Sequence, residues 1–263
     1  TCTENCTEKK VKLAIGYYYA QRLRDAVTSL NLIPQNKKTE KVYHHLAIFY
    51  QMLNQWDKAI LTLEEARNRL TVGPDIEHLL AQYYMQIGRY HDAIALLKLL
   101  AGQWEGNLWQ LYYQIGYAYL KQNNLDEAER YLELSLKQNR KALLPRGLLA
   151  FISNRKGNVE KAKKLWLTNL KDDPNNHVLW TNMGLAYEAD GDWEKALDCY
   201  MKVKELQKDD NAILLNIGIV QMELERFRDA QHTFSSALQG PLRKDAAYNL
   251  FVLALKQNKK KKA

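Results

Sequence analysis

The sequence predicts an all-α chain made of stacked helix-turn-helix units, and three regularities predict it. Small residues recur at steps of 33 to 35 residues: Ala14, Ala47, Ala81, Gly116, Ala150, Gly184 and Gly218. An alanine follows each of them after twelve residues: Ala26, Ala59, Ala93, Ala128, Ala162, Ala196 and Ala230. Four residues after each alanine comes a large apolar residue: Leu30, Leu63, Leu97, Leu132, Trp166, Tyr200 and Phe234. A fixed period of this length indicates repeats that stack on their neighbours.

Residues 177–210 show the repeating unit most clearly. An apolar helical face precedes a turn at Gly191 and Asp192, and a second apolar face follows it. The order of the residues is similar to the tetratricopeptide signature, with Met in the Leu position: Trp180, Met183, Gly184, Tyr187, Ala196 and Tyr200. Because the pattern recurs along the whole chain, the sequence is identified as a member of the tetratricopeptide-repeat family.

The resemblance implies a right-handed superhelical solenoid, because one such repeat cannot bury its apolar face alone. Close packing explains the small residues. We expect the two helices of each repeat to cross where the small residue meets the alanine. A larger side chain there would hold the backbones apart, and overpacking typically costs ~1–3 kcal/mol.

The repeats follow one another in order after an N-terminal extension at 1–6. We expect seven complete repeats at about 7–39, 40–73, 74–108, 109–142, 143–176, 177–210 and 211–244. Pro34 marks the end of the first repeat, and Pro74 opens the third at a helix start, where a missing N–H costs nothing. The fifth repeat is the least regular, since Ser153 replaces the Tyr found three residues after the small position in most repeats.

The connector between the third and fourth repeats is distinctive. It places Trp104 and Trp109 beside Gly102 and Gly106. The two tryptophans are either exposed anchors for a partner or residues that pack back over the preceding helix. We favour packing.

Residues 246–263 align with residues 111–128 of the fourth repeat, so we expect residues 245–263 to form the first helix of a partial eighth repeat with a Lys-rich end. Phe251 falls at the small position. The lysines at 259–262 are either the turn and start of a second helix, which we favour, or a solvated basic tail. Because this helix is apolar nearly all round, we expect further chain, a second copy or a partner to cover it.

In this family the first helices line a concave groove, and the side chains that reach it lie three before, one after and four after the small residue. Here these positions are mostly apolar or aromatic, which suits a peptide or helix that carries apolar anchors. The alternative is that they pack between adjacent first helices. The candidate partner-binding residues are Tyr113, Tyr117, Leu120, Phe151, His78, Gln82, Leu185 and Ile219, together with Trp104 and Trp109.

One polar constellation lies among these positions. His44 and His78 occupy equivalent places in adjacent repeats, with Asp75 and Gln82 one helical turn from His78. They could form a metal site or a pH-sensitive contact. We favour hydrogen-bonded groove lining and assign no metal and no cofactor. The carboxylate clamp of chaperone-binding family members is not expected either, because its leading Lys and the Asn partner are missing from every complete repeat.

Composition excludes several function classes. The chain has 263 residues, of which 46% are hydrophobic and 26% charged, as in an ordinary globular protein. No apolar run approaches ~18 residues, so we expect no membrane span. The net charge of +8 falls to +4 without the lysines at 259–262, which makes nucleic acid an unlikely partner. No Gly-rich phosphate loop, GxSxG or HExxH motif points to an enzyme or to a small-molecule substrate.

The N-terminus and the three cysteines allow a few further expectations. The chain begins at Thr1 without an apolar signal segment, so we expect a mature form or a cut fragment, soluble, with the cytoplasm favoured over the periplasm. Cys199 is expected to pack inside the sixth repeat. Cys2 and Cys6 are favoured as unpaired terminal residues over a disulfide.

We therefore expect a non-catalytic scaffold or adaptor for protein–protein interaction, as one module of a larger protein or complex. It would bind a partner peptide or helix in an apolar, aromatic concave groove. One alternative is a targeting or regulatory module of an enzyme whose catalytic domain lies outside this chain. The other is a helical solenoid that binds nucleic acid.

Overall fold

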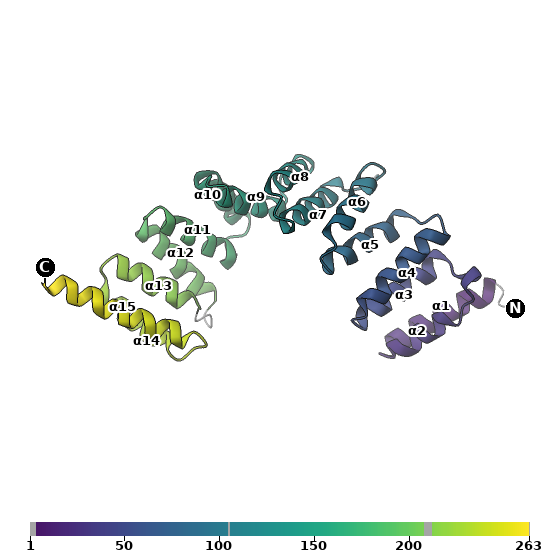
Figure 1. Cartoon of the computed structure of the whole chain (residues 1–263), viewed down its shortest axis with the longest axis horizontal. Helices are drawn as coiled ribbons and strands as arrows, with labels where there is room; N and C mark the ends of the chain where they lie inside the picture. The colour runs from purple at the N-terminus through teal and green to yellow at the C-terminus, as the bar shows by residue number, and fades with distance from the viewer. Residues whose placement is uncertain (1–3, 105, 208–211, 263) are drawn as a thin grey trace. The chain divides into compact units, whose positions relative to one another are not determined.

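The computed structural model describes residues 4–104, 106–207 and 212–262 (Figure 1). It contains fifteen α-helices and one short 3-10 helix, and the described residues include no strand. The predicted all-α fold of stacked helical repeats is confirmed. The chain divides into two compact units, residues 1–140 and 141–263.

Each unit is a stack of helical hairpins. Unit 1 consists of α1 (Glu4–Tyr19), α2 (Leu23–Asn31), the 3-10 helix η1 (Gln35–Lys37), α3 (Glu40–Met52), α4 (Trp56–Arg69), α5 (Pro74–Gln86), α6 (Tyr90–Ala101), α7 (Leu108–Lys121) and α8 (Leu125–Gln138). Unit 2 consists of α9 (Leu143–Arg155), α10 (Val159–Asp172), α11 (His177–Ala189), α12 (Trp193–Leu206), α13 (Ala212–Glu223), α14 (Phe227–Ala237) and α15 (Arg243–Lys262). Helices pair from α1/α2 to α13/α14, and within a unit each second helix also packs on the next first helix.

The small residues lie buried between the two helices of each hairpin. All seven small residues and all seven repeat alanines are buried. At Gly116 the backbone of Ala128 lies 3.2 Å from the Cβ position, as expected, but the nearest neighbour of all three glycines is the large residue four positions after the alanine. A Cβ on Gly184 would lie 2.3 Å from the Tyr200 ring, and one on Gly218 would lie 2.4 Å from the Phe234 ring. In these three hairpins a large side chain therefore packs against bare backbone.

The turn of every hairpin has one geometry. The residue seven positions after the small residue adopts a left-handed conformation, with φ between 58° and 82°, in all seven hairpins: Gln21, Asn54, Gly88, Asn123, Gly157, Gly191 and Glu225. The next backbone N–H then bonds to a carbonyl five residues back at 2.8–2.9 Å. This is the Schellman arrangement, which satisfies carbonyls left open at a helix end. It turns the chain sharply and starts the second helix two residues later.

The tyrosines three positions after the small residue join successive hairpins. The hydroxyl groups of three of them form hydrogen bonds with polar side chains on the second helix of the preceding hairpin. Three such hydrogen bonds join Asn31 to Tyr50 at 2.9 Å, Glu64 to Tyr84 at 2.5 Å and Lys98 to Tyr119 at 2.7 Å. The fifth hairpin departs from this chemistry as its sequence suggested: Ser153 is buried, and the buried Arg146 pairs with Asp172 at 2.7 Å.

The C-terminal helix differs from expectation. We expected the lysine run to contain a turn, but α15 continues through it to Lys262. Asn258, which stands where the other hairpins have a left-handed residue, is helical here. Lysine has a good helix propensity, and the run contains neither Gly nor Pro to interrupt it. Phe251, at the small position, is 61% exposed.

The structure also bears on the expectations for the cysteines and for a membrane span. Cys199 is buried within the sixth hairpin, as expected. The question of a Cys2–Cys6 pair falls outside the described residues, because Cys2 is not among them. Within the described ranges, no helix combines the length and apolar character needed to span a bilayer.

The closest contact can be tested with a pair of glycines. We expect Gly184→Ala to lower the free energy of unfolding by ~1–3 kcal/mol, because the new methyl group overlaps the Tyr200 ring. Gly16→Ala is the control, since nothing lies within 4 Å of a Cβ at this helical glycine. It should raise the free energy of unfolding by ~0.5–1 kcal/mol. Urea denaturation measures both, and a neutral Gly184→Ala would contradict the packing model.

The turn geometry predicts substitution effects of opposite sign at equivalent positions. Gln21 has φ 59°, so Gln21→Gly should stabilise the chain by roughly 0.5–1 kcal/mol through relief of left-handed strain. Gly191 has φ 73° and nothing near its Cβ position, so Gly191→Ala should cost about 1 kcal/mol from backbone strain alone. Thermal unfolding monitored by circular dichroism measures the two shifts. Equal signs would show that the turn residue does not decide stability.

Candidate functional site

The candidate binding residues fall on the first helices of both units. In unit 1, α5 carries His78 and Gln82, and α7 carries Tyr113, Tyr117 and Leu120. Gln82 is exposed, and the other four are half-buried. The structure thus gives unit 1 a surface of partly covered aromatic and polar side chains. We call these five residues the unit 1 face.

A hydrogen bond ties the two helices of the unit 1 face together. Nε2 of His78 donates to Oε1 of Gln114 at 2.8 Å, which links α5 to α7. The Trp104 ring meets the His78 ring edge-on, with centroids 5.8 Å apart. Trp104 is half-buried and packs against the hydrophobic core of unit 1. The favoured packing interpretation of this tryptophan agrees with that position.

Trp104 also explains the glycine that follows it. A Cβ on Gly106 would lie 2.3 Å from Nε1 of Trp104, so the indole occupies the space that a side chain at 106 would need. Trp109 is half-buried at the start of α7, and its carbonyl accepts a hydrogen bond from Oγ of Ser135 at 2.6 Å. The connector therefore folds against the unit that it belongs to.

The two tyrosines of α7 form an amphipathic pair. Their ring centroids are 6.4 Å apart, and Nζ of Lys121 lies 5.2 Å from the Tyr117 centroid. Burial raises the pKa of Tyr113, and the charge of Tyr117 adds to this effect. The Tyr113 phenol is therefore a neutral hydrogen-bonding group at neutral pH, and both rings lie half-buried on the surface of α7. Such a surface can hold an apolar side chain and bond to a peptide backbone at once.

The histidines do not assemble into a metal site. His44 packs edge-on against His45, with ring centroids 5.8 Å apart, while His78 bonds to Gln114. Among the residues that the structure describes, no three His, Cys, Asp or Glu side chains are grouped so that they could hold a metal ion. Burial and the charge of His45 lower the pKa of His44, while Asp75 and Glu40 oppose this shift.

Unit 2 presents a more exposed apolar surface. Phe151 on α9 is 41% exposed, and Leu185 at the equivalent place on α11 is 47% exposed. About two helical turns nearer the N-terminus of the same helices, Leu144 and Val178 are also exposed. We call these four residues the unit 2 face. Ile219, the third candidate in this unit, is half-buried and packs against the cluster that contains Phe234 and Leu253, so α14 and α15 partly cover it.

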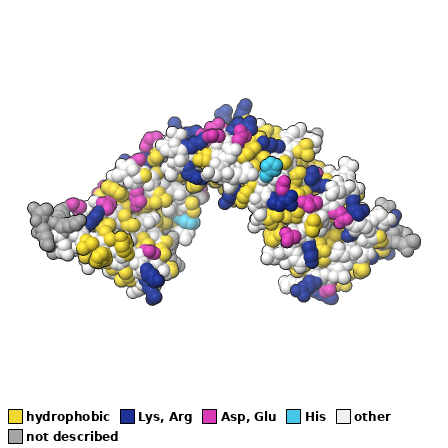
Figure 2. Space-filling view, in the orientation of Figure 1, with side chains coloured by type: hydrophobic (Ala, Val, Ile, Leu, Met, Phe, Trp, Pro, Cys, Tyr) yellow, Lys and Arg dark blue, Asp and Glu magenta, His cyan; other side chains and the backbone are white. Residues whose placement is uncertain are grey.

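A second apolar surface lies on α15. Tyr248, Phe251 and Leu255 are exposed by 67%, 61% and 47%. Figure 2 shows hydrophobic side chains gathered beside the C-terminal end of the chain. The sequence predicted this apolar helix, and the structure shows which side of it remains open among the described residues.

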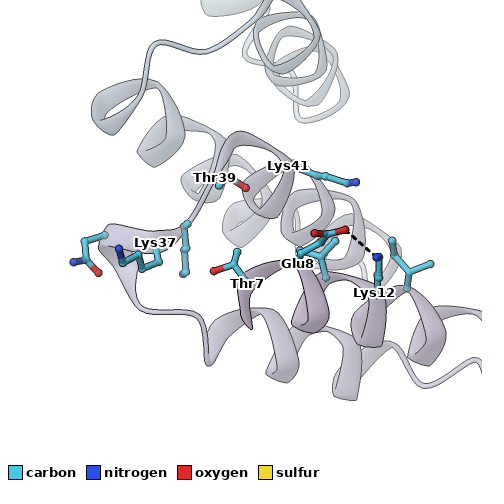
Figure 3. A pocket seen from close by; sticks show the side chains of 10 residues that line it. Thr7, Glu8, Lys12, Lys37, Thr39 and Lys41 are labelled. Carbon is cyan, nitrogen blue, oxygen red and sulfur yellow. Dashed lines mark ion pairs between the residues drawn. The ribbon is translucent and has the colours of Figure 1, made fainter. Parts of the chain in front are cut away.

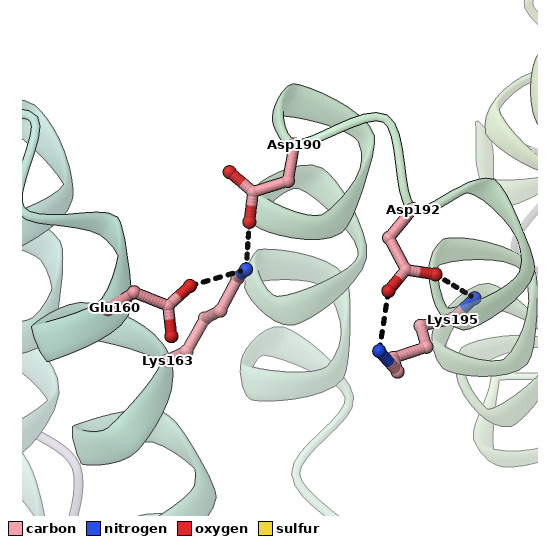
Figure 4. A network of polar contacts seen from close by, with 5 residues as sticks. All are labelled: Glu160, Lys163, Asp190, Asp192 and Lys195. Atoms are coloured by element: carbon pink, nitrogen blue, oxygen red, sulfur yellow. Dashed lines mark hydrogen bonds and ion pairs between the residues drawn. The ribbon is translucent and has the colours of Figure 1, made fainter.

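Sequence reasoning missed a charged network between the fifth and sixth hairpins (Figure 4). The side chain of Lys163 is only 10% exposed, and it pairs with Glu160 at 3.1 Å and with Asp190. Lys163 and Lys195 lie 4.7 Å and 5.4 Å from the Tyr187 ring centroid. Burial lowers the pKa of Lys163, but its hydrogen bonds to Asp190 and Glu160 outweigh burial and raise it. The Glu-x-x-Lys spacing was the one signal of this network in the sequence.

Two family models match parts of the chain. Residues 52–135 match the model described as anaphase-promoting complex, cyclosome, subunit 3. Residues 177–210 match the model described as tetratricopeptide repeat. The second match covers the segment in which the repeat signature is clearest.

The chain is also similar in sequence to two known proteins. The chain is 24% identical over 257 residues to the BBSome complex member BBS4 of Bos taurus, a match that covers 95% of this chain and 48% of that protein. It is 33% identical over 78 residues to the protein O-mannosyl-transferase TMTC3 of Mus musculus, a match that covers 30% of this chain and 8% of that protein. The chain therefore spans about half the length of the BBS4 relative, and far less of TMTC3.

The fold is shared with the C-terminal part of a TPR repeat-containing protein from Cytophaga hutchinsonii. The TM-score is 0.75 at 17% identity, and the match covers 91% of this chain and 99% of that one. At this identity the likeness concerns the fold alone.

Burial of His44 predicts how the free energy of unfolding depends on pH. Because its pKa is lowered below 6.5, the neutral imidazole stabilises the fold above that pH, and this contribution is lost as the pH falls. The free energy of unfolding should decrease on acidification, and it should decrease less in His44→Gln. An NMR titration of the imidazole resonances gives the midpoint directly. A His44 midpoint above 6.5 would contradict the assigned burial.

Proposed function

Since this chain is a tetratricopeptide-repeat protein, we propose that it is a non-catalytic scaffold that holds a protein partner on the first helices of its repeats. We also propose that the seven hairpins are the seven complete repeats predicted from the sequence. The partner's segment presents apolar anchors, and the scaffold belongs to a multiprotein complex. The name of the BBS4 relative, a complex member, supports the last point.

The observation that carries the proposal is the repeated exposure of Phe151 and Leu185. These residues occupy the same register on neighbouring first helices and leave large apolar areas in water. Internal packing does not require either exposed side chain, because the small residue and the repeat alanine of each hairpin are already buried. Adjacent exposed apolar side chains in a repeating array mark an interaction surface. An amphipathic helix with apolar side chains along one face fits such an array.

The unit 1 face would supply a different kind of contact. Its side chains are half-buried, so it offers less apolar area, but His78, Tyr113 and Tyr117 bring polar groups to the surface. Large aromatic residues with a polar tip contribute strongly to binding because they bury much area with few rotatable bonds. In this proposal Leu120, Gln82 and the Trp104–Trp109 connector border the same contact.

A second candidate is a repeat module that targets or regulates a larger enzyme. The likeness to a stretch of TMTC3, a transferase by name, favours this candidate over a solenoid that binds nucleic acid. In that case the repeats would still bind protein, and the catalytic domain would lie outside these residues.

The proposal predicts the effect of charges on the unit 2 face. Phe151→Glu combined with Leu185→Glu should reduce capture of the partner at least roughly tenfold, because two apolar anchors would be replaced by hydrated charges. The matched control is Leu167→Glu with Met201→Glu, which changes two similarly exposed apolar residues on the second helices α10 and α12. Cross-linked pull-down from native extract with quantitative mass spectrometry compares the two. Circular dichroism first establishes that both variants fold. Equal recovery of all partners by both variants would exclude the unit 2 face as the binding surface.

A further inference from the structure

A pocket opens at the N-terminal end of unit 1 (Figure 3). It lies between α1 and the segment that leads from η1 into α3, and its volume is about 520 Å³. Its walls come from two stretches of the chain, within residues 7–15 and 36–41. This volume lies within the range of ~300–1,000 Å³ typical of ligand pockets in proteins.

The inner side of this pocket is apolar. Val11 is buried and Ile15 is half-buried, and both belong to the core that joins the first two hairpins. Because these positions lie three before and one after the small residue Ala14, they correspond in register to Gly147 and Phe151 in unit 2. The first helix α1 therefore turns the same side toward the pocket that α9 turns toward the unit 2 face.

The rim carries a local excess of positive charge. Lys12, Lys37, Lys38 and Lys41 face one carboxylate, Glu8, which pairs with Lys12 at 2.8 Å. This gives the lining a net charge of +3, whereas the chain without its lysine run has a charge of +4 over more than two hundred residues. The excess is therefore a feature of this pocket and not of the whole surface.

Three of these lysines form no ion pair with any acidic side chain that the structure describes. Among the side chains that the structure describes, no carboxylate lies within ion-pair distance of Lys37, Lys38 or Lys41. Lys38 stands 5.8 Å from the centroid of the Tyr43 ring. In Figure 3, Lys37 lies at one end of the pocket, and Lys12 and Lys41 lie at the other. Lysine side chains therefore stand at both ends of the pocket.

The electrostatics of Glu8 agree with this arrangement. The pKa of Glu8 is lowered by its hydrogen bond and charge interaction with Lys12, and the charge of Lys41 lowers it further. A carboxylate at this place is therefore already held in its charged form by lysines from two different helices.

We propose that this pocket binds an acidic segment of a protein partner, with an apolar side chain of that segment lying on Val11 and Ile15 between the lysines. The charges would steer the segment and the apolar contact would retain it. A protein segment fits better than nucleic acid, because a phosphate backbone calls for an extended basic stripe and this pocket is confined, with an apolar inner side. The proposal goes beyond the scaffold function, since it concerns another surface and a partner of different chemistry.

Fluorescence anisotropy with a labelled short peptide tests the proposal. The probe carries one leucine within a run of glutamate and aspartate, and a control peptide carries glutamine in place of every acid. The full chain should bind the acidic probe and not the control. In Lys37→Glu combined with Lys41→Glu the affinity should fall at least roughly tenfold, because two attractive charges become repulsive. Both residues are exposed, so the variant retains its core.

A matched variant separates the pocket from overall charge. Arg24→Glu combined with Lys137→Glu makes the same change in net charge at two exposed positions outside the pocket, on α2 and α8. It should bind the probe as the unaltered chain does. Equal loss in both variants, or no binding by the unaltered chain, would overturn the proposal. So would tighter binding of single-stranded RNA or of vesicles containing phosphatidylserine that is lost in the same pocket variant. The Phe151 and Leu185 variant leaves this pocket intact, so the two proposals fail independently.

Discussion

The structure depends on one contact, repeated once in each hairpin, in which a large side chain packs against the small residue of the facing helix. The three glycines show how little space is left, since an added Cβ would come within 2.3–2.8 Å of the opposing side chain. In the other hairpins an alanine occupies this place and is fully buried. Because the helices meet at this distance, the side chains beside the contact interlock, and the hairpin becomes a unit that its neighbour can stack upon.

A second constraint fixes where the second helix starts. One residue in left-handed conformation and one hydrogen bond across it reverse the chain in every hairpin, although only three of the seven left-handed residues are glycines. Together the contact and the turn determine the register of both helices. Neither of them fixes the residue type at the positions three before and one after the small residue, which differ between hairpins. Function can therefore vary at those positions, as the change from Ile15 to Phe151 to Ile219 illustrates, without altering the fold.

The repeat architecture was predictable from sequence because it rests on local residues at fixed spacing, which a single chain displays. The solvent exposure of individual side chains was not predictable in the same way. Phe151 and Ile219 stand in equivalent places, yet Phe151 is exposed and Ile219 is half-buried, because Ile219 packs against a cluster with residues from α14 and α15. Packing by a neighbouring helix cannot be read from the residue itself. The Lys163 network was missed for a similar reason, since its partner Asp190 lies in the turn of the next hairpin. The turn expected in the lysine run was wrong because register alone suggested it, while the local residues favour a continuous helix.

The same reasoning limits how α15 can be covered. In every complete hairpin a large side chain of the second helix packs against the small residue of the first helix. This packing requires a glycine or an alanine at the small position. Phe251 puts an aromatic ring into this position, with Tyr248 and Leu255 beside it. A second helix of the usual kind would meet this ring at the place where its own large residue must lie. A segment that packs on α15 must therefore lie farther from the axis of α15 than each second helix lies from its first helix. Its side chains must pack around the Phe251 ring, because the ring occupies the space that a large side chain of a second helix would need.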